Sequence, residues 1–183
     1  MDYKRLMREA LGQAEAARDD GDWAIGCIIA LGNEIIARGR NTVNSTRNRL
    51  AHAEINALLE LQLDHFDHDV NGDMLLVTTF EPCIMCYGAV VLSGIRKIVS
   101  GVNLDNSGAS AMASHLPTYF QQPRYETTMI TGVLERDCAE MWASGQAAQE
   151  MLANGYVLPK NIEDLSNDNL PVIYTTSVLP TTP

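Results

Sequence analysis

The sequence predicts an α/β domain of three layers, with helices on both faces of a mixed sheet of about five strands. Segments with apolar residues at three- and four-residue spacing alternate along the chain with short apolar runs of strand length. The chain has 183 residues, of which 46% are hydrophobic and 20% charged. This length and composition suit one globular domain with a sizeable buried core.

The first part of the chain predicts a helix, a hairpin and a second helix. Residues 3–18 form one apolar helical stripe, made of Leu6, Met7, Ala10, Leu11, Ala14 and Ala17. The apolar run 24–31 is separated from residues 34–39 by Gly32-Asn33, a dipeptide typical of tight turns, so these two segments form the hairpin. After a polar loop at 40–50, helical spacing resumes over residues 51–63.

The second part predicts three strands and two helices. Residues 74–80 form a strand that ends at Glu81-Pro82, and a helix with proline in its first turn runs to about Ser93. Strands follow at 97–102 and near 125–131, and a last helix spans 134–153. Residues 155–183 hold four of the seven prolines, so we expect an extended or partly disordered arm outside a domain of residues 1–154.

Charge and cysteine content narrow the function. The 13 basic and 23 acidic residues give a net charge of −10, which disfavours unspecific binding to nucleic acid or anionic membranes. The sequence contains no run of eighteen apolar residues, and its mixed-charge start differs from a signal peptide, so we expect neither a membrane span nor a signal peptide. The four unevenly spaced cysteines suit reduced thiols. We therefore expect a cytoplasmic protein, without membrane contact, that acts on a small molecule.

Two short motifs carry the chemistry. His52-Ala53-Glu54 opens the second helix, and Pro82-Cys83-Ile84-Met85-Cys86 opens the third. One histidine and two cysteines match a catalytic zinc site, in which the protein supplies three ligands and water takes the fourth position. Helix starts also stabilise thiolates. Glu54 is placed to stand beside the metal as an acid and base.

These motifs resemble the cytidine deaminase superfamily of zinc hydrolases, particularly the branch with guanine deaminase and tRNA adenosine deaminases. The resemblance covers residues 3 to 154. Ala24-Ile25-Gly26 matches a small-apolar-Gly strand, Asn41 lies eleven positions before His52, and residues 87–90 continue the cysteine helix as Tyr-Gly-Ala-Val. A cytidine-deaminase-like α/β/α fold is thereby implied.

The resemblance also implies roles for individual residues. His52, Cys83 and Cys86 are expected to bind Zn²⁺, and Glu54 to move protons while zinc-activated water displaces ammonia from the ring. Asn41 is expected to hydrogen-bond the base, with Ile25 and Ala53 in the same substrate pocket. Relatives are commonly homodimers, so a homodimer is expected here as well.

Some of these residues have other interpretations. A Cys-x-x-Cys pair at a helix start also suits a thioredoxin-like redox site, although His52 and Glu54 then have no role. Asn41 would equally serve a turn after a strand. Tyr119 and Phe120 would either close the pocket by stacking on a flat heterocycle or pack beneath their own irregular segment.

For the substrate, we expect a free nucleobase or nucleoside, a guanine-type purine rather than cytosine, with release of ammonia. The alternative is a tRNA wobble adenosine-to-inosine deaminase. Residues 35–53 support this alternative because they contain Arg38, Arg40, Arg47 and Arg49 and no acidic residue, although a solvated loop is the favoured interpretation of this segment. The acidic last helix and the net charge oppose it, so tRNA is the disfavoured partner. A zinc-stabilised interaction protein without catalysis is a third reading, opposed by the intact Glu54.

Overall fold

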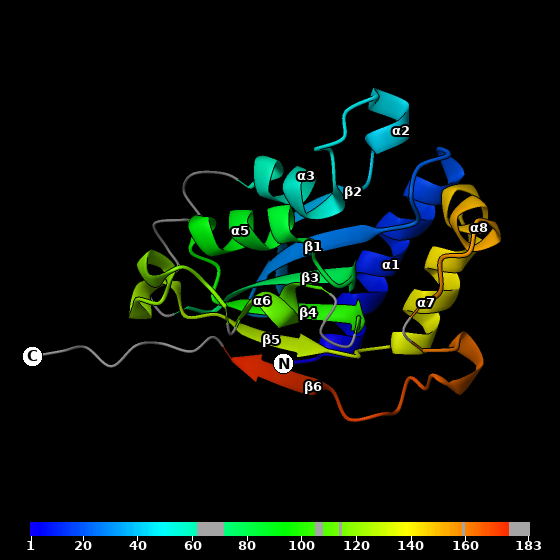
Figure 1. Cartoon of the computed structure of the whole chain (residues 1–183). Coiled ribbons are helices and arrows are strands. Elements are labelled where there is room, and N and C mark those ends of the chain that lie inside the picture. The colour runs from blue at the N-terminus through cyan, green and yellow to red at the C-terminus, as the bar shows by residue number, and fades with distance from the viewer. Residues whose placement is uncertain (62–71, 105–107, 114, 159, 176–183) are drawn as a thin grey trace, which may run out of the picture.

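The computed structural model describes residues 1–61, 72–104, 108–113, 115–158 and 160–175, and it confirms the predicted three-layer α/β arrangement (Figure 1). Its six-stranded sheet has the order β2-β1-β3-β4-β5-β6. β3 pairs in parallel with β4, and β4 with β5, whereas the other neighbours are antiparallel. The strands are β1 (Gly26–Leu31), β2 (Glu34–Arg40), β3 (Met74–Phe80), β4 (Lys97–Val102), β5 (Thr128–Thr131) and β6 (Val172–Thr175).

Helices cover both faces of this sheet. The α-helices are α1 (Tyr3–Asp19), α2 (Val43–Thr46), α3 (Ala53–Glu60), α5 (Ile84–Ser93), α6 (Ala109–Ala113), α7 (Glu135–Ser144) and α8 (Gln146–Ala153). Single turns of 3-10 helix are η1 (Thr118–Phe120), η2 (Pro123–Tyr125) and η3 (Ile162–Asp164). In Figure 1, α3 and α5 lie on one side of the sheet, with α1 and α7 on the other.

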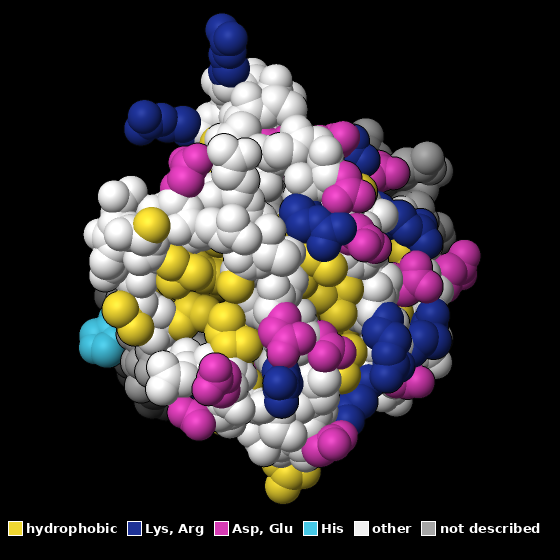
Figure 2. Space-filling view, turned by 90° about the vertical axis from the view of Figure 1, so that its right-hand side faces the viewer, with side chains coloured by type: hydrophobic (Ala, Val, Ile, Leu, Met, Phe, Trp, Pro, Cys, Tyr) yellow, Lys and Arg dark blue, Asp and Glu magenta, His cyan; other side chains and the backbone are white. Residues whose placement is uncertain are grey.

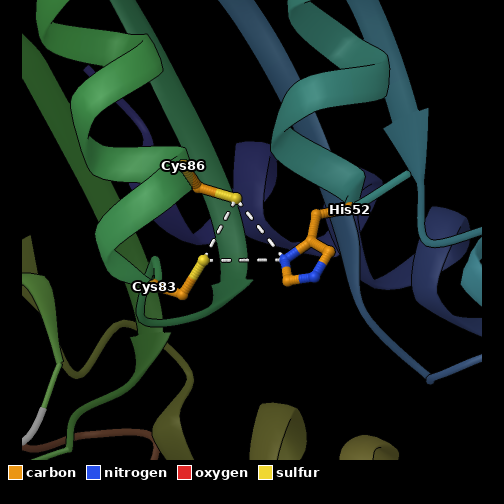
Figure 3. A group of neighbouring side chains, drawn as sticks. All are labelled: His52, Cys83 and Cys86. Atoms are coloured by element: carbon orange, nitrogen blue, oxygen red, sulfur yellow. Dashed lines mark hydrogen bonds between the residues drawn. The ribbon is translucent and has the colours of Figure 1, made fainter. Parts of the chain in front are cut away.

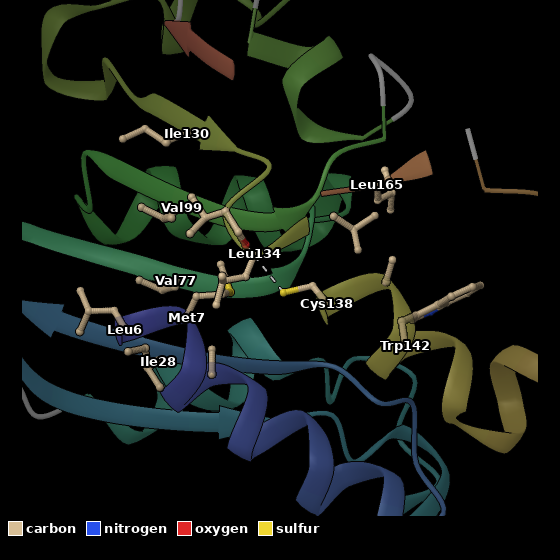
Figure 4. Packing of buried hydrophobic residues seen from close by; sticks show 14 of the residues in the cluster. Leu6, Met7, Ile28, Val77, Val99, Ile130, Leu134, Cys138, Trp142 and Leu165 are labelled. Carbon is tan, nitrogen blue, oxygen red and sulfur yellow. Dashed lines mark hydrogen bonds between the residues drawn. The ribbon is translucent and has the colours of Figure 1, made fainter. Parts of the chain in front are cut away.

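Two apolar cores result, one on each face of the sheet. Alternation along β3 sends Leu75 and Val77 into the core beneath α1 and α7, which Figure 4 shows, and Leu76 into the core beneath α3 and α5. The same period of two places Thr78 on the face of α3 and α5. That face carries the predicted chemistry.

The structure differs from the predicted elements at the end of the chain. The helix expected over 134–153 is broken at Gly145, whose backbone is extended, into α7 and α8. The expected arm contributes a sixth strand, because β6 pairs with β5 from Thr128 opposite Thr175 to Thr131 opposite Val172. Positions 62–63 of the second predicted helix and 176–183 of the arm lie outside the described residues.

The sheet brings the two motifs together at one edge. β2 leads through the α2 loop into α3, and β3 leads directly into α5. β2 and β3 lie on either side of β1, and each helix starts near the carboxyl end of the strand before it. Gly39 permits α3 to lie close to β2, because a Cβ at this position would overlap the carbonyl of Ala53. Within the described residues, no helix is long and apolar enough to cross a membrane.

Candidate metal centre and active site

The three predicted ligands meet in space (Figure 3). His52 Nδ1 lies 3.7 Å from Cys83 Sγ and 3.5 Å from Cys86 Sγ, and the two sulfurs are 3.6 Å apart. Tetrahedral zinc at its usual distances from nitrogen and sulfur separates two such ligands by about 3.6–3.8 Å. The donor set therefore fits zinc in both chemistry and size, and these residues are positioned to hold the ion.

Helix starts position each of the three ligands. His52 is the N-cap of α3 and Cys83 the N-cap of α5, with Cys86 in the first turn of α5. The hydrogen bond between the two sulfurs lowers the pKa of the Cys83 thiol to about 4 and raises the pKa of the Cys86 thiol. The Cys83 sulfur is thus favoured as a thiolate, which is the form that binds zinc.

Glu54 stands next to this centre without belonging to it. Its side chain is 4% exposed, and Thr78 Oγ1 donates a 3.3 Å hydrogen bond to its Oε1. Burial raises the pKa of the Glu54 carboxyl, since the charged form is poorly solvated. A carboxyl in such a place is suited to accept and return a proton near neutral pH.

A cavity of about 560 Å³ opens onto the metal centre. Figure 2 shows a hollow with hydrophobic walls on this face of the molecule, below the region of α2. The walls come from the α2 loop, the end of β3, the segment after β4, and α7 with α8. Beyond His52, Glu54 and Cys83, they include Trp23, Ile25, Asn41, Phe80, Glu81, Leu104, Gly108, Ala111, Met112, Trp142, Met151 and Tyr156.

Asn41 and Ile25 are among the lining residues, as the sequence suggested. Asn41 is 2% exposed, and its Oδ1 accepts the N–H of Val43 at 3.1 Å, which is the turn interaction that the sequence also allowed. Its amide nitrogen carries no hydrogen bond among the described residues. Ala53 differs from the expectation, because it is fully buried in the core under α3 and does not line the cavity.

Tyr119 and Phe120 also differ from the expectation of a stacking lid. Neither contributes to the cavity in the described part of the chain. Their rings contact each other edge-on at 5.1 Å and both pack against Tyr125, while Arg124 lies over the Tyr119 and Tyr125 rings. The aromatic side chains thus stabilise their own irregular segment, which is the second interpretation of this pair.

Several cavity residues were not singled out from the sequence. Trp142 contacts both Phe80 and Tyr156, with ring centroids at 5.4 and 6.0 Å, and this group brings the C-terminal helices to the cavity. Glu81 is a buried carboxylate beside the metal-binding turn. The sequence indicated a role for Glu81 only through its position directly before Pro82-Cys83. Tyr156 lies on the expected arm, and no sequence pattern indicated that it would reach the cavity.

Residues 1–102 match the cytidine and deoxycytidylate deaminase zinc-binding region. The chain belongs to this family. It is a zinc-dependent hydrolytic deaminase that acts on a cyclic amidine, and the resemblance read from the motifs is confirmed.

Sequence relatives sharpen the comparison. The chain is 35% identical over 137 residues to a tRNA-specific adenosine deaminase of Bacillus subtilis, which covers 74% of this chain and 83% of the relative. It is 31% identical over 139 residues to a tRNA-specific adenosine deaminase of Streptococcus pyogenes, covering 74% and 84%.

Solved structures agree on the fold. A tRNA:A34 deaminase that performs A-to-I editing at the wobble position superposes with a TM-score of 0.60 and 27% identity, covering 75% of this chain and 98% of that one. Guanine deaminase from Nitrosomonas europaea superposes with a TM-score of 0.59 and 29% sequence identity, covering 77% of this chain and 83% of that one.

The sequence relatives overturn one expectation. They are tRNA-specific adenosine deaminases, so the expected preference for a free guanine-type base is wrong.

The acidic last helix was the sequence argument against tRNA as the partner. Its charges are largely engaged within the protein: Glu135 is buried and pairs with Lys160 at 3.1 Å, and Glu140 pairs with Arg136 at 2.9 Å. Asp137 accepts a hydrogen bond from Asn167. A count of acidic residues along the sequence therefore overstates the negative field that this helix presents.

Proposed function

We propose that this protein deaminates adenosine to inosine in tRNA, at the wobble position of the anticodon. The observation that carries the proposal is the similarity to curated tRNA-specific adenosine deaminases over about three quarters of the chain. An apolar cavity that ends at a zinc-binding triad and a buried carboxyl supports it, since a base turned out of its stack needs such a pocket.

The residues of the site take the following roles. Zinc held by His52, Cys83 and Cys86 would supply a Lewis acid that makes water nucleophilic near neutral pH. Glu54 removes one proton from the attacking water and passes it to the ring nitrogen. It then passes the remaining proton of the added hydroxyl to the amino group, which departs as ammonia while the carbonyl forms. Asn41 donates its free amide N–H to the base and so fixes the reacting carbon beside Glu54.

Four arginines precede His52 in the sequence: Arg38, Arg40, Arg47 and Arg49. This segment, the arginine loop, supplies a contact for the RNA backbone. Arg38 and Arg40 pair with Glu9 and Asp20, at 3.8 and 2.7 Å. Arg47 and Arg49, by contrast, are exposed, and their side chains form no hydrogen bond or ion pair among the described residues. Arg49 lines a second pocket together with Asn41 and His52. Basic side chains project from this part of the molecule in Figure 2. Phosphates on either side of a bound adenosine would meet them.

The test compares purified zinc-loaded protein on an adenosine-containing anticodon stem-loop with free adenine, adenosine, guanine and cytosine. We expect inosine in the stem-loop and a kcat/KM at least about 100-fold above that for any free base or nucleoside. A matched stem-loop with guanosine at the same position is the control. Ammonia release from a free base, without inosine in the stem-loop, would refute the proposal.

The proposal includes a homodimer and a cytoplasmic location. Large apolar side chains on the outer faces of α3 and α5 are exposed, Leu59 by 79%, Ile84 by 68% and Leu92 by 65%, and a second copy would cover them. Light scattering should give twice the 20.1 kDa chain mass, and Leu59→Glu combined with Leu92→Glu should give a monomer. The paired thiolates need a reducing compartment.

A further inference from the structure

Glu81 links the metal-binding turn to the opposite wall of the cavity. It follows the last residue of β3 and precedes Pro82-Cys83, and its side chain is 3% exposed. Its Oε2 accepts the backbone N–H of Leu104 and its Oε1 that of Ser110, both at 2.7 Å. Such short distances are typical of charge-assisted hydrogen bonds. One carboxylate thus holds two separate points of the chain after β4.

The chain held in this way forms part of the cavity. Leu104, Gly108, Ala111 and Met112 all line it. The backbone adds a third connection, because Ala109 donates its N–H to the carbonyl of Pro82 at 3.1 Å. The turn that carries Cys83 and this wall are therefore bonded at three places, and the width of the cavity depends on those bonds.

Gly108 shows how closely the wall fits the carboxylate. A Cβ at Gly108 would lie 2.6 Å from Glu81 Cδ and 2.8 Å from Oε1, and these atoms with Cγ are its nearest neighbours. Ordinary contacts between such atoms are near 3.5 Å. An alanine at this position would have to displace either the wall or the Glu81 side chain.

Glu135 supports the same wall from the other side. Its Oε1 accepts the N–H of Asn103 at 3.3 Å and pairs with Lys160 at 3.1 Å. The adjacent N–H groups of residues 103 and 104 are thus held by carboxylates from two different elements. Glu81 has no paired cation among the described residues, so the two N–H groups are what stabilises its buried charge.

We propose that Glu81 is a positioning residue for the deamination reaction: it sets the distance between the metal centre and the wall formed by Leu104 and residues 108–112, and so determines how tightly the target base is held. Each of its oxygens accepts a backbone N–H of the wall, which suits a residue that positions the wall, whereas proton transfer is assigned to Glu54. The inference rests on the proposed function only for its kinetic readout.

The first experiment measures Glu81→Ala, Glu81→Gln and the control Glu126→Ala, which removes an exposed carboxyl, in the full zinc-loaded chain. In Glu81→Ala we expect amide hydrogen exchange at Leu104 and Ser110 to accelerate roughly tenfold or more, because both acceptors are lost. In Glu81→Gln the acceleration should be smaller, because the amide oxygen still provides one of the two acceptors. With the stem-loop substrate, KM should rise roughly tenfold with a smaller change in kcat. Zinc content should not change.

The second experiment is a double-mutant cycle. Gly108→Ala should raise KM in the native background but have little further effect in Glu81→Ala, because the side chain with which it collides is absent there. Independent effects of the two substitutions would overturn the proposal. So would native exchange rates at Leu104 and Ser110 in Glu81→Ala. Since exchange needs no substrate, these results stand even if the stem-loop is not deaminated.

Discussion

Thr78 and Glu54 form a hydrogen bond between the sheet and the helix that carries the acid and base. The donor, Thr78 Oγ1, is completely buried in β3, and it lies 3.3 Å from Oε1 of Glu54 in the first turn of α3. A single rotamer of the carboxyl beside the metal centre is therefore favoured. Removing this hydroxyl should disturb the orientation of Glu54 without removing it.

We accordingly expect Thr78→Val, which keeps the shape of the side chain, to lower kcat about tenfold while leaving zinc content unchanged. The control is Thr79→Val on the same strand. Its hydroxyl accepts the N–H of Gly26 at 3.1 Å, so this variant should lose stability but keep kcat. Equal kcat values for the two valine variants would contradict the proposed role of Thr78.

Glu54→Gln tests the acid and base directly. The amide is nearly the same size but cannot accept and return a proton, so kcat should fall by about 10³-fold while the ion stays bound. Elemental analysis and inosine formation are measured on the same sample. Glu60→Gln, exposed at the end of the same helix, serves as the control. Substantial turnover in Glu54→Gln would place the proton transfer elsewhere.

The metal centre was predictable from the sequence because its signals are local. His52, Cys83 and Cys86 stand at helix starts, and their positions relative to those helices follow from the backbone alone. The hairpin and the central strands were equally clear, since their apolar runs end at turn residues such as Gly32 and Pro82.

The walls of the cavity were not predictable in the same way. Trp142 and Tyr156 reach it only because α7 and the chain beyond α8 fold back over the end of β3, which no periodicity encodes. For Tyr119 and Phe120 the sequence left two interpretations open, and the structure shows their rings packed against one another in the irregular segment. The edge strand β6 was missed because its side chains are mostly exposed.

Cys83→Ala or Cys86→Ala should remove the metal. Two remaining ligands bind zinc poorly, so the ion content should fall from one per chain to near zero, and the melting temperature should drop because binding and folding are coupled. Cys27→Ala is the matched control, since Cys27 is completely buried in β1 but lies in the apolar core. It should lose stability and keep zinc. Retention of zinc in both ligand variants would refute this ligand set.

Tyr87 gives a prediction for alkaline pH. Its hydroxyl is buried with no hydrogen-bond partner in the described structure, and burial raises the pKa of Tyr87 to about 12. Between pH 10 and 12 the unfolded chain loses this proton while the folded chain keeps it, so the free energy of unfolding falls as pH rises. The total loss is about 1.4 kcal/mol for each unit by which the folded pKa exceeds the unfolded pKa. Tyr87→Phe should match the wild type at pH 7 and lose less stability at pH 11. Chemical denaturation at both values measures this, and an equal loss in the two proteins would contradict it.

The arginine loop provides the sharpest separation between a tRNA and a small-molecule substrate. If Arg47 and Arg49 contact phosphates, replacing both with alanine should raise KM for the stem-loop roughly tenfold and lower the slope of log KM against log salt concentration by about 1.5. Arg38 and Arg40 are the matched pair, because their charges are already engaged by Glu9 and Asp20, and their replacement should change that slope less. A salt dependence that is the same in both double variants and the wild type would show that RNA does not lie along this loop.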